Sequence, residues 1–184
     1  MVGWVVRSLY ARRSSSAPPH ERTLAVLVGA RALVERGWVQ GAWYVLEAPD
    51  GRRRAIGAGS LTRRSFGEIV QSCLVGAVIE SARWHTAERG AAGPAIDTVW
   101  QELGELSGGR PPVDPRTPMP VLRSRQVGEL TSWNDCRDRS RDDVVRLLDA
   151  AIARMSATAV PAPRPAPEPA PDPSGSPASV GTRS

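Results

Sequence analysis

Two separated polar segments carry the side chains that packing alone explains poorly. Gln40 lies within residues 38–42, and Asn134 and Asp135 directly follow Trp133. One hypothesis is a small enzyme whose site contains Asn134 and Asp135, although the residues suggest no substrate. The structural alternative is that Asn and Asp form turns which fix the path of the chain into the next helix.

The two cysteines and two histidines lack the spacing of a metal site, such as CxxC or HxxxH. Cys73 and His85 are 12 residues apart on one predicted helix, about 18 Å along its axis, which excludes a catalytic dyad. Cys73 lies in an apolar stretch, and we expect a small buried hydrophobe. Cys136 stands beside Arg137 and Arg139, whose charges could lower its pKa; an incidental surface cysteine is the favoured interpretation. We expect no metal and no cofactor.

Five arginines cluster around a predicted turn and the start of the helix that follows it. They are Arg52, Arg53, Arg54, Arg63 and Arg64, and no acid interrupts the sequence between Asp50 and Glu68. Such a group could hold phosphate, so nucleic-acid binding is an alternative function. The simpler interpretation is a solvated turn with a few salt bridges.

The basic composition excludes several enzyme classes. All 24 basic residues are Arg, and the chain contains no Lys. P-loop NTPases, pyridoxal phosphate enzymes and Schiff-base aldolases each need a Lys side chain and are therefore excluded.

The net charge of +5 is unevenly distributed along the chain, because residues 20–156 hold 19 Arg against 17 acids. A nucleic-acid-binding domain usually concentrates positive charge in its folded part.

The chain shows no pattern of secretion or membrane insertion. Its first ten residues lack a basic region followed by a long apolar core. No apolar run approaches the roughly 20 residues that a membrane span requires. Two cysteines do not make a disulfide framework, so we expect a reducing cytoplasm.

Apolar spacing predicts helices at both ends of the foldable region. A first helix follows Pro18 and Pro19 and ends at Gly37. A last helix follows Ser140 as its N-cap, with Val144, Leu148, Ala151, Ile152 and Met155 on one face.

Between these helices we expect a hairpin and two further helices. Residues 39–47 and 52–56 flank the turn Pro49-Asp50-Gly51 and predict a short hairpin. Ser65 and Glu68 form the pattern of a capping box, which predicts a second helix from residue 65 or 66 to about residue 84. A third helix is expected from Pro94 to residue 106. Residues 110–120 contain five Pro and are expected to be irregular.

The two ends differ in composition from the middle. Residues 1–19 hold three Arg and no acid, and residues 157–184 hold eight Pro. We expect a disordered basic arm over 1–19, with an organelle transit peptide as the alternative. A single globular domain is expected over 20–156 and a disordered Pro/Ala-rich tail over 157–184. The tail is interpreted as a solubilising segment, with a peptide ligand for an aromatic groove as the alternative.

Three short motifs follow one another along the chain: Trp38-Val-Gln-Gly-Ala42, Cys73-Leu-Val-Gly-Ala77 and Trp133-Asn-Asp135. Their order and spacing resemble a family of small proteins of actinobacteria and their phages, a domain of unknown function, over about residues 22–155. That family often has Cys at the position of Val39, and this departure argues against an obligatory cysteine pair or metal. The resemblance implies a fold and a lineage, and it marks the positions worth testing: Trp38, Gln40, Gly41, Gly76, Trp133, Asn134 and Asp135.

We therefore expect a mainly α domain, with about four helices around one core and a short β-hairpin. The leading hypothesis for function is a non-catalytic binding or accessory module with an unknown protein partner. Its candidate binding residues are Trp38, Gln40, Gly41, Trp133, Asn134 and Asp135. Nucleic-acid binding through the arginines and an enzyme site at Asn134 and Asp135 are the alternatives.

Overall fold

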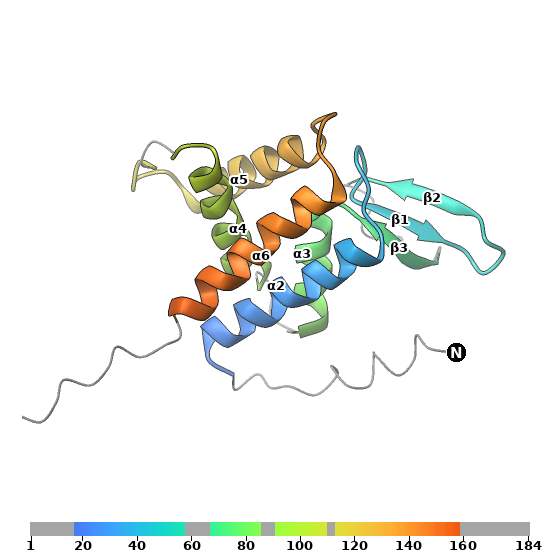
Figure 1. Cartoon of the computed structure of the whole chain (residues 1–184), viewed down its shortest axis with the longest axis horizontal. Coiled ribbons are helices and arrows are strands. Elements are labelled where there is room, and N and C mark those ends of the chain that lie inside the picture. Colours follow the sequence, from blue (N-terminus) through green and yellow to red (C-terminus); the bar gives the residue numbers. More distant parts are fainter. Residues whose placement is uncertain (1–16, 58–66, 86–90, 110–112, 159–184) are drawn as a thin grey trace, which may run out of the picture.

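The computed structural model describes residues 17–57, 67–85, 91–109 and 113–158, and these form five helices and one three-stranded sheet (Figure 1). In chain order the elements are α2 (Pro19–Arg36), β1 (Tyr44–Glu47), β2 (Arg53–Ile56), β3 (Glu68–Ser72), α3 (Leu74–His85), α4 (Ala92–Leu106), α5 (Met119–Asn134) and α6 (Arg141–Thr158). The predicted fold class, mainly α with a small β component, is confirmed. One helix and one strand exceed the prediction.

Helix α2 is the centre of the helical layer. It packs on α3 and on α6, and α2 and α6 lie side by side and antiparallel (Figure 1). Its fully buried residues Val26, Leu27, Ala30 and Val34 recur at helical spacing. The helix begins at Pro19, and the Gly37 N–H donates to the Leu33 carbonyl where the helix ends, as the sequence predicts.

The β-sheet lies at one side of the helical layer and has the strand order β2-β1-β3, all antiparallel (Figure 1). The predicted hairpin is confirmed: Tyr44 pairs with Ile56, and Glu47 pairs with Arg53. Strand β1 is the central strand, which is why Tyr44, Val45 and Leu46 are all buried.

Strand β3 corrects the predicted second helix. Residues 68–72 are extended and pair with β1, with Leu46 opposite Ile69 and a register shift beside it. The β-branched pair Ile69-Val70 fits a strand beside β1, and the helix starts only at Leu74. Glu68 therefore begins a strand instead of completing a capping box, and Ser65 lies outside the described residues.

Helix α5 gives the second correction. Residues 119 and 120 were expected to be irregular, but they are helical, and the helix continues to Asn134, directly before Asp135. Pro118 and Pro120 flank its first residue, positions that tolerate a missing backbone N–H. Leu130 is its one fully buried apolar residue, and Leu122, Val127 and Trp133 pack against the core only partly buried, so its apolar pattern is weak. Apolar periodicity could not reveal it.

Helix α6 follows its prediction closely. The Asp143 N–H donates to Ser140 Oγ at 3.2 Å, and the Ser140 N–H donates to Asp143 Oδ2 at 2.8 Å. This reciprocal pair is a capping box. Val144, Leu147, Leu148 and Ala151 are then buried against α2 and α4.

Candidate functional site

Asn134 is the last residue of α5, and its side chain is fully buried where three elements meet. Its Oδ1 accepts from the Trp38 indole N–H at 2.8 Å and from the Leu74 backbone N–H at 3.1 Å. Its Nδ2 donates to the Val39 carbonyl at 3.2 Å and to Asp135 Oδ1 at 2.8 Å. A side-chain amide accepts two hydrogen bonds and donates two, so Asn134 uses its full hydrogen-bonding capacity. Asn134 and its four partners Trp38, Val39, Leu74 and Asp135 form what we call the polar hub.

The hub also determines how α3 begins. Leu74 is the first residue of α3, and the first backbone N–H groups of a helix have no partner within the helix. Asn134 accepts one of them from a position 60 residues further along the chain. Cys73 Sγ accepts a second, from the Gly76 N–H at 3.3 Å. Two side chains thus cap the helix.

At the surface, Gln40, Gly41 and Asp135 connect the loop after α2 to the end of α5. Gln40 Nε2 donates to the carbonyls of Asn134 and Cys136, at 2.9 and 2.8 Å. The Gly41 N–H donates to Asp135 Oδ1 at 3.0 Å, and Gly41 has a φ of +69°, which other residues rarely adopt. The residues selected from the sequence therefore converge, and they bond mainly to one another.

Trp133 lies in the last turn of α5, half-buried against the core. The Arg139 guanidinium stacks on its ring, with 4.0 Å between the carbon centre and the ring centroid. Cation–π contacts of this kind hold a charged side chain against an aromatic surface. The short connection from α5 to α6 is thereby pinned over Trp133.

Gly76 fits tightly against the strand side of the hub. A Cβ at this position would lie 2.5 Å from the Trp43 carbonyl oxygen. The neighbour is the backbone that leads into β1, and Tyr44 donates its hydroxyl hydrogen to the Gly76 carbonyl at 2.9 Å.

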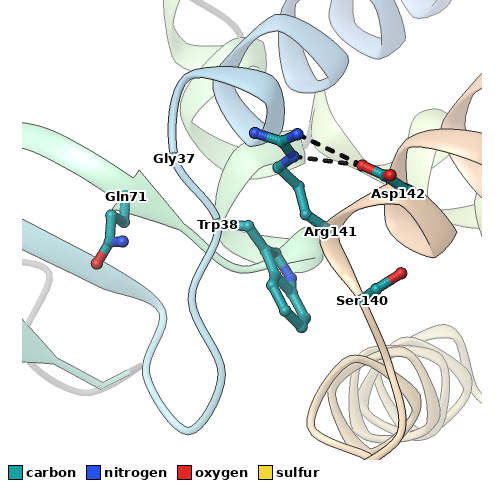
Figure 2. A pocket seen from close by; sticks show the side chains of 6 residues that line it. All are labelled: Gly37, Trp38, Gln71, Ser140, Arg141 and Asp142. Atoms are coloured by element: carbon teal, nitrogen blue, oxygen red, sulfur yellow. Dashed lines mark hydrogen bonds and ion pairs between the residues drawn. The ribbon is translucent and has the colours of Figure 1, made fainter.

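A hollow of about 440 Å³ opens to solvent beside the hub (Figure 2). Its lining residues are Gly37, Trp38, Gln71, Ser140, Arg141 and Asp142. Figure 2 shows the Trp38 indole between Gln71 on β3 and the start of α6. Because the Trp38 N–H is held by Asn134, the ring has a fixed orientation at this hollow.

A protein-family model matches residues 18–154, which include both the hub and the hollow. The chain belongs to DUF6197, a family of unknown function. No curated protein and no solved structure matches it. Membership in DUF6197 therefore carries no assigned activity to these residues.

Sequence reasoning selected Trp38 but missed Gln71, Arg141 and Asp142, which line the hollow of this DUF6197 domain. Gln71 belonged to a wrongly predicted helix. Arg141 and Asp142 directly follow the predicted N-cap Ser140. With Trp38, that N-cap is the sequence signal at this place.

The two thiols of the DUF6197 domain have opposite environments. Burial raises the pKa of Cys73 to about 11, so that thiol stays protonated at neutral pH. His85 lies at the other end of α3, as predicted, and cannot activate it. Cys136 is exposed, and neither cysteine forms a disulfide. Among the described residues, no three His, Cys, Asp or Glu side chains gather as metal ligands.

The arginine patch is exposed on β2 and the turn before it. Arg52 Nε pairs with Asp50 at 2.7 Å, and Arg53 Nε pairs with Glu47 at 2.5 Å. Arg54 is exposed as well, whereas Arg63 and Arg64 lie outside the described residues.

Within the described part of the chain, no helix is both long and apolar enough to cross a membrane.

Proposed function

We propose that this DUF6197 domain is a non-catalytic binding module that recognises a protein partner at the hollow beside Trp38. The observation that carries the proposal is the fixed Trp38 ring, held from behind by the fully bonded Asn134. A rigid aromatic ring loses little conformational entropy on binding. Trp and Arg are also the side chains that most often dominate protein interfaces, and Arg141 lines the same hollow.

The shape of the hollow supports a protein partner over a small molecule. It is open to solvent and its rim is charged, since the side chains of Arg141 and Asp142 are 56% and 71% exposed. Small-molecule sites are usually enclosed and mostly apolar. An open hollow of mixed polarity with one aromatic ring fits the core and rim of a protein interface.

The enzyme alternative is weakened because its candidate residues, Asn134 and Asp135, are already hydrogen-bonded within the hub. Both the amide oxygen and the amide nitrogen of Asn134 are already bonded twice. Asp135 Oδ1 accepts from Gly41 and from Asn134. Asn134 would have to give up native hydrogen bonds before it could contact a substrate, and Asp135 Oδ1 is already engaged in the hub.

Nucleic-acid binding through Arg52, Arg53 and Arg54 remains the second candidate. It is supported by the exposure of β2, which is an edge strand. Two of these arginines already pair with neighbouring acids, which reduces the charge they can offer to phosphate.

The experiment is site-specific photo-crosslinking in cells, followed by a titration. A photoreactive residue at Gln71 is expected to capture one protein, whereas the same residue at the exposed position of Ser156, in the last turn of α6, is expected not to. The purified captured protein should bind saturably, and Arg141→Ala should weaken binding about five-fold or more. Arg116→Ala, also exposed, is the matched control. Equal capture at both positions, or equal effects of both substitutions, would overturn the proposal.

We also infer a cytoplasmic, actinobacterial or phage setting. The two free cysteines support a reducing compartment. The all-Arg composition and the motif pattern support the lineage.

A further inference from the structure

Helix α5 is attached to the domain by an unusual balance of contacts. Its three buried residues are Gln126, Leu130 and Asn134, spaced four apart on one face, and two of them are polar. By comparison, the four buried residues of α6 are all apolar. Apolar burial is the main stabilising term in helix packing, so α5 has the weaker attachment.

Polar contacts add to the few apolar ones, which are Leu130 and the partly buried Leu122, Val127 and Trp133. Gln126 Nε2 donates to Asp97 Oδ1 at 2.8 Å, and the Trp100 indole N–H donates to Glu129 Oε2 at 2.7 Å. Arg123 donates to the Gly93 carbonyl at 2.9 Å. Hydrogen bonds add little net stability, because water competes for both groups.

Two buried polar atoms of α5 lower its stability further. Gln126 Oε1 and Thr131 Oγ1 are buried with no hydrogen-bond partner among the described residues. Opening of the helix would return both atoms to water. The cost of leaving such groups unsatisfied therefore favours opening.

The surface loop of residues 38–42 is tied to the same helix. Its side chain Gln40 and the backbone of Val39 and Gly41 bond to residues 134–136. The residues on either side of the loop have other partners. The Gly37 carbonyl accepts from the Ser72 N–H, and the Trp43 N–H donates to the Ile56 carbonyl. Trp38, the first residue of the loop, also forms an isolated β-bridge with Ser72. The loop interior thus follows α5, while its ends stay with the sheet.

We propose that α5 and residues 38–42 form one unit that opens cooperatively while α2, α3 and α6 stay folded. Opening would release Trp38 from Asn134 and uncap the first N–H of α3. It would also uncover the surface beneath Leu130. A ligand that binds only one of the two states would shift the population between them. The inference does not depend on a partner at the hollow.

The test is native-state hydrogen exchange on the full chain, read by mass spectrometry. Amides of α5 and of residues 38–42 should exchange faster than those of α2 and α6, and they should share one dependence on dilute denaturant that is weaker than that of global unfolding. Gln40→Ala removes two hydrogen bonds at an exposed side chain, so the domain keeps its core. It should speed exchange in α5 roughly 3- to 30-fold, although Gln40 is not part of α5.

Gln101→Ala is the matched control, because Gln101 is an exposed glutamine on α4. It should leave exchange in α5 and in residues 38–42 unchanged. Two results would overturn the inference: exchange of α5 only through global unfolding, at the rate of α2, or an effect of Gln40→Ala that stays within the loop.

Discussion

The Trp38 indole nitrogen donates to Asn134 Oδ1 at 2.8 Å, across 96 positions of sequence. This bond joins the loop after α2 to the end of α5. The same oxygen caps α3 through Leu74. One buried amide thereby fixes the relative positions of three segments that are remote in sequence.

The apolar face of α6 gives the first prediction. Leu148 is fully buried, so Leu148→Ala should lower the free energy of unfolding by about 2–5 kcal/mol. Urea denaturation measures the change. Leu106→Ala is the matched control, because Leu106 is 66% exposed, and its effect should stay within about 0.5 kcal/mol. Similar effects of the two substitutions would contradict the packing described for α6.

The second prediction concerns the thiols. In the folded protein near pH 8, iodoacetamide should label Cys136 and leave Cys73 unmodified, because Cys73 is buried and its pKa is raised to about 11. Both should react in 6 M guanidinium. Peptide mass spectrometry distinguishes the sites. Rapid native labelling of Cys73 would show that the start of α3 is open.

The third prediction concerns the cap of α6. Ser140→Ala should destabilise the domain by about 0.5–2 kcal/mol. Hydrogen bonds from Ser140 and the charge of Arg146 lower the pKa of Asp143 from 3.8 to about 2. Because the folded pKa is the lower one, the carboxylate stabilises the fold above about pH 4 and loses that effect as pH falls towards 2.

Asp143→Asn tests the sign of this dependence. The melting temperature of the variant should lie below that of the unmodified chain at neutral pH. The difference should shrink between about pH 4 and pH 2. A difference that stays constant over this range would mean that the charge of Asp143 has no role in the cap.

The fourth prediction separates the two binding hypotheses. The full chain should bind mixed-sequence DNA and RNA only weakly near physiological salt, because residues 20–156 hold 19 Arg against 17 acids. A salt titration measures this, with a slope near −0.9 per phosphate contact on duplex DNA. Replacing Arg52, Arg53 and Arg54 with Gln should change the slope little. Sub-micromolar affinity, with a slope that flattens in the variant, would favour the nucleic-acid hypothesis.

The elements with clear apolar periodicity could be predicted from the sequence. Helices α2, α4 and α6 lie close to their expected bounds, and the hairpin follows its turn. Strand β3 was misread because Ile69 and Val70 continue into the apolar run of α3. Helix α5 was missed because Leu130 is its one fully buried apolar residue, and its docking depends on polar contacts with α4 that no local pattern reveals.

The candidate residues were also only partly readable. Gln40 and Asn134 stood out because polar residues inside conspicuous motifs need partners. Their partners are largely backbone atoms, such as the Leu74 N–H and the Val39 carbonyl. Side-chain identity carries no information about backbone partners 60 or 95 positions away. Sequence could therefore indicate which residues matter, but not that they bond to one another.

The most direct test of the polar hub is a double-mutant cycle between Trp38 and Asn134, measured by urea unfolding. Trp38→Phe removes the indole N–H, and Asn134→Ala removes its acceptor. If the two side chains stabilise each other as described, their coupling energy should be about 1–3 kcal/mol. A parallel cycle pairing Asn134→Ala with Trp84→Phe, at a Trp that is 46% exposed, should give additive effects. Additivity within about 0.5 kcal/mol for Trp38 and Asn134 would contradict the hub.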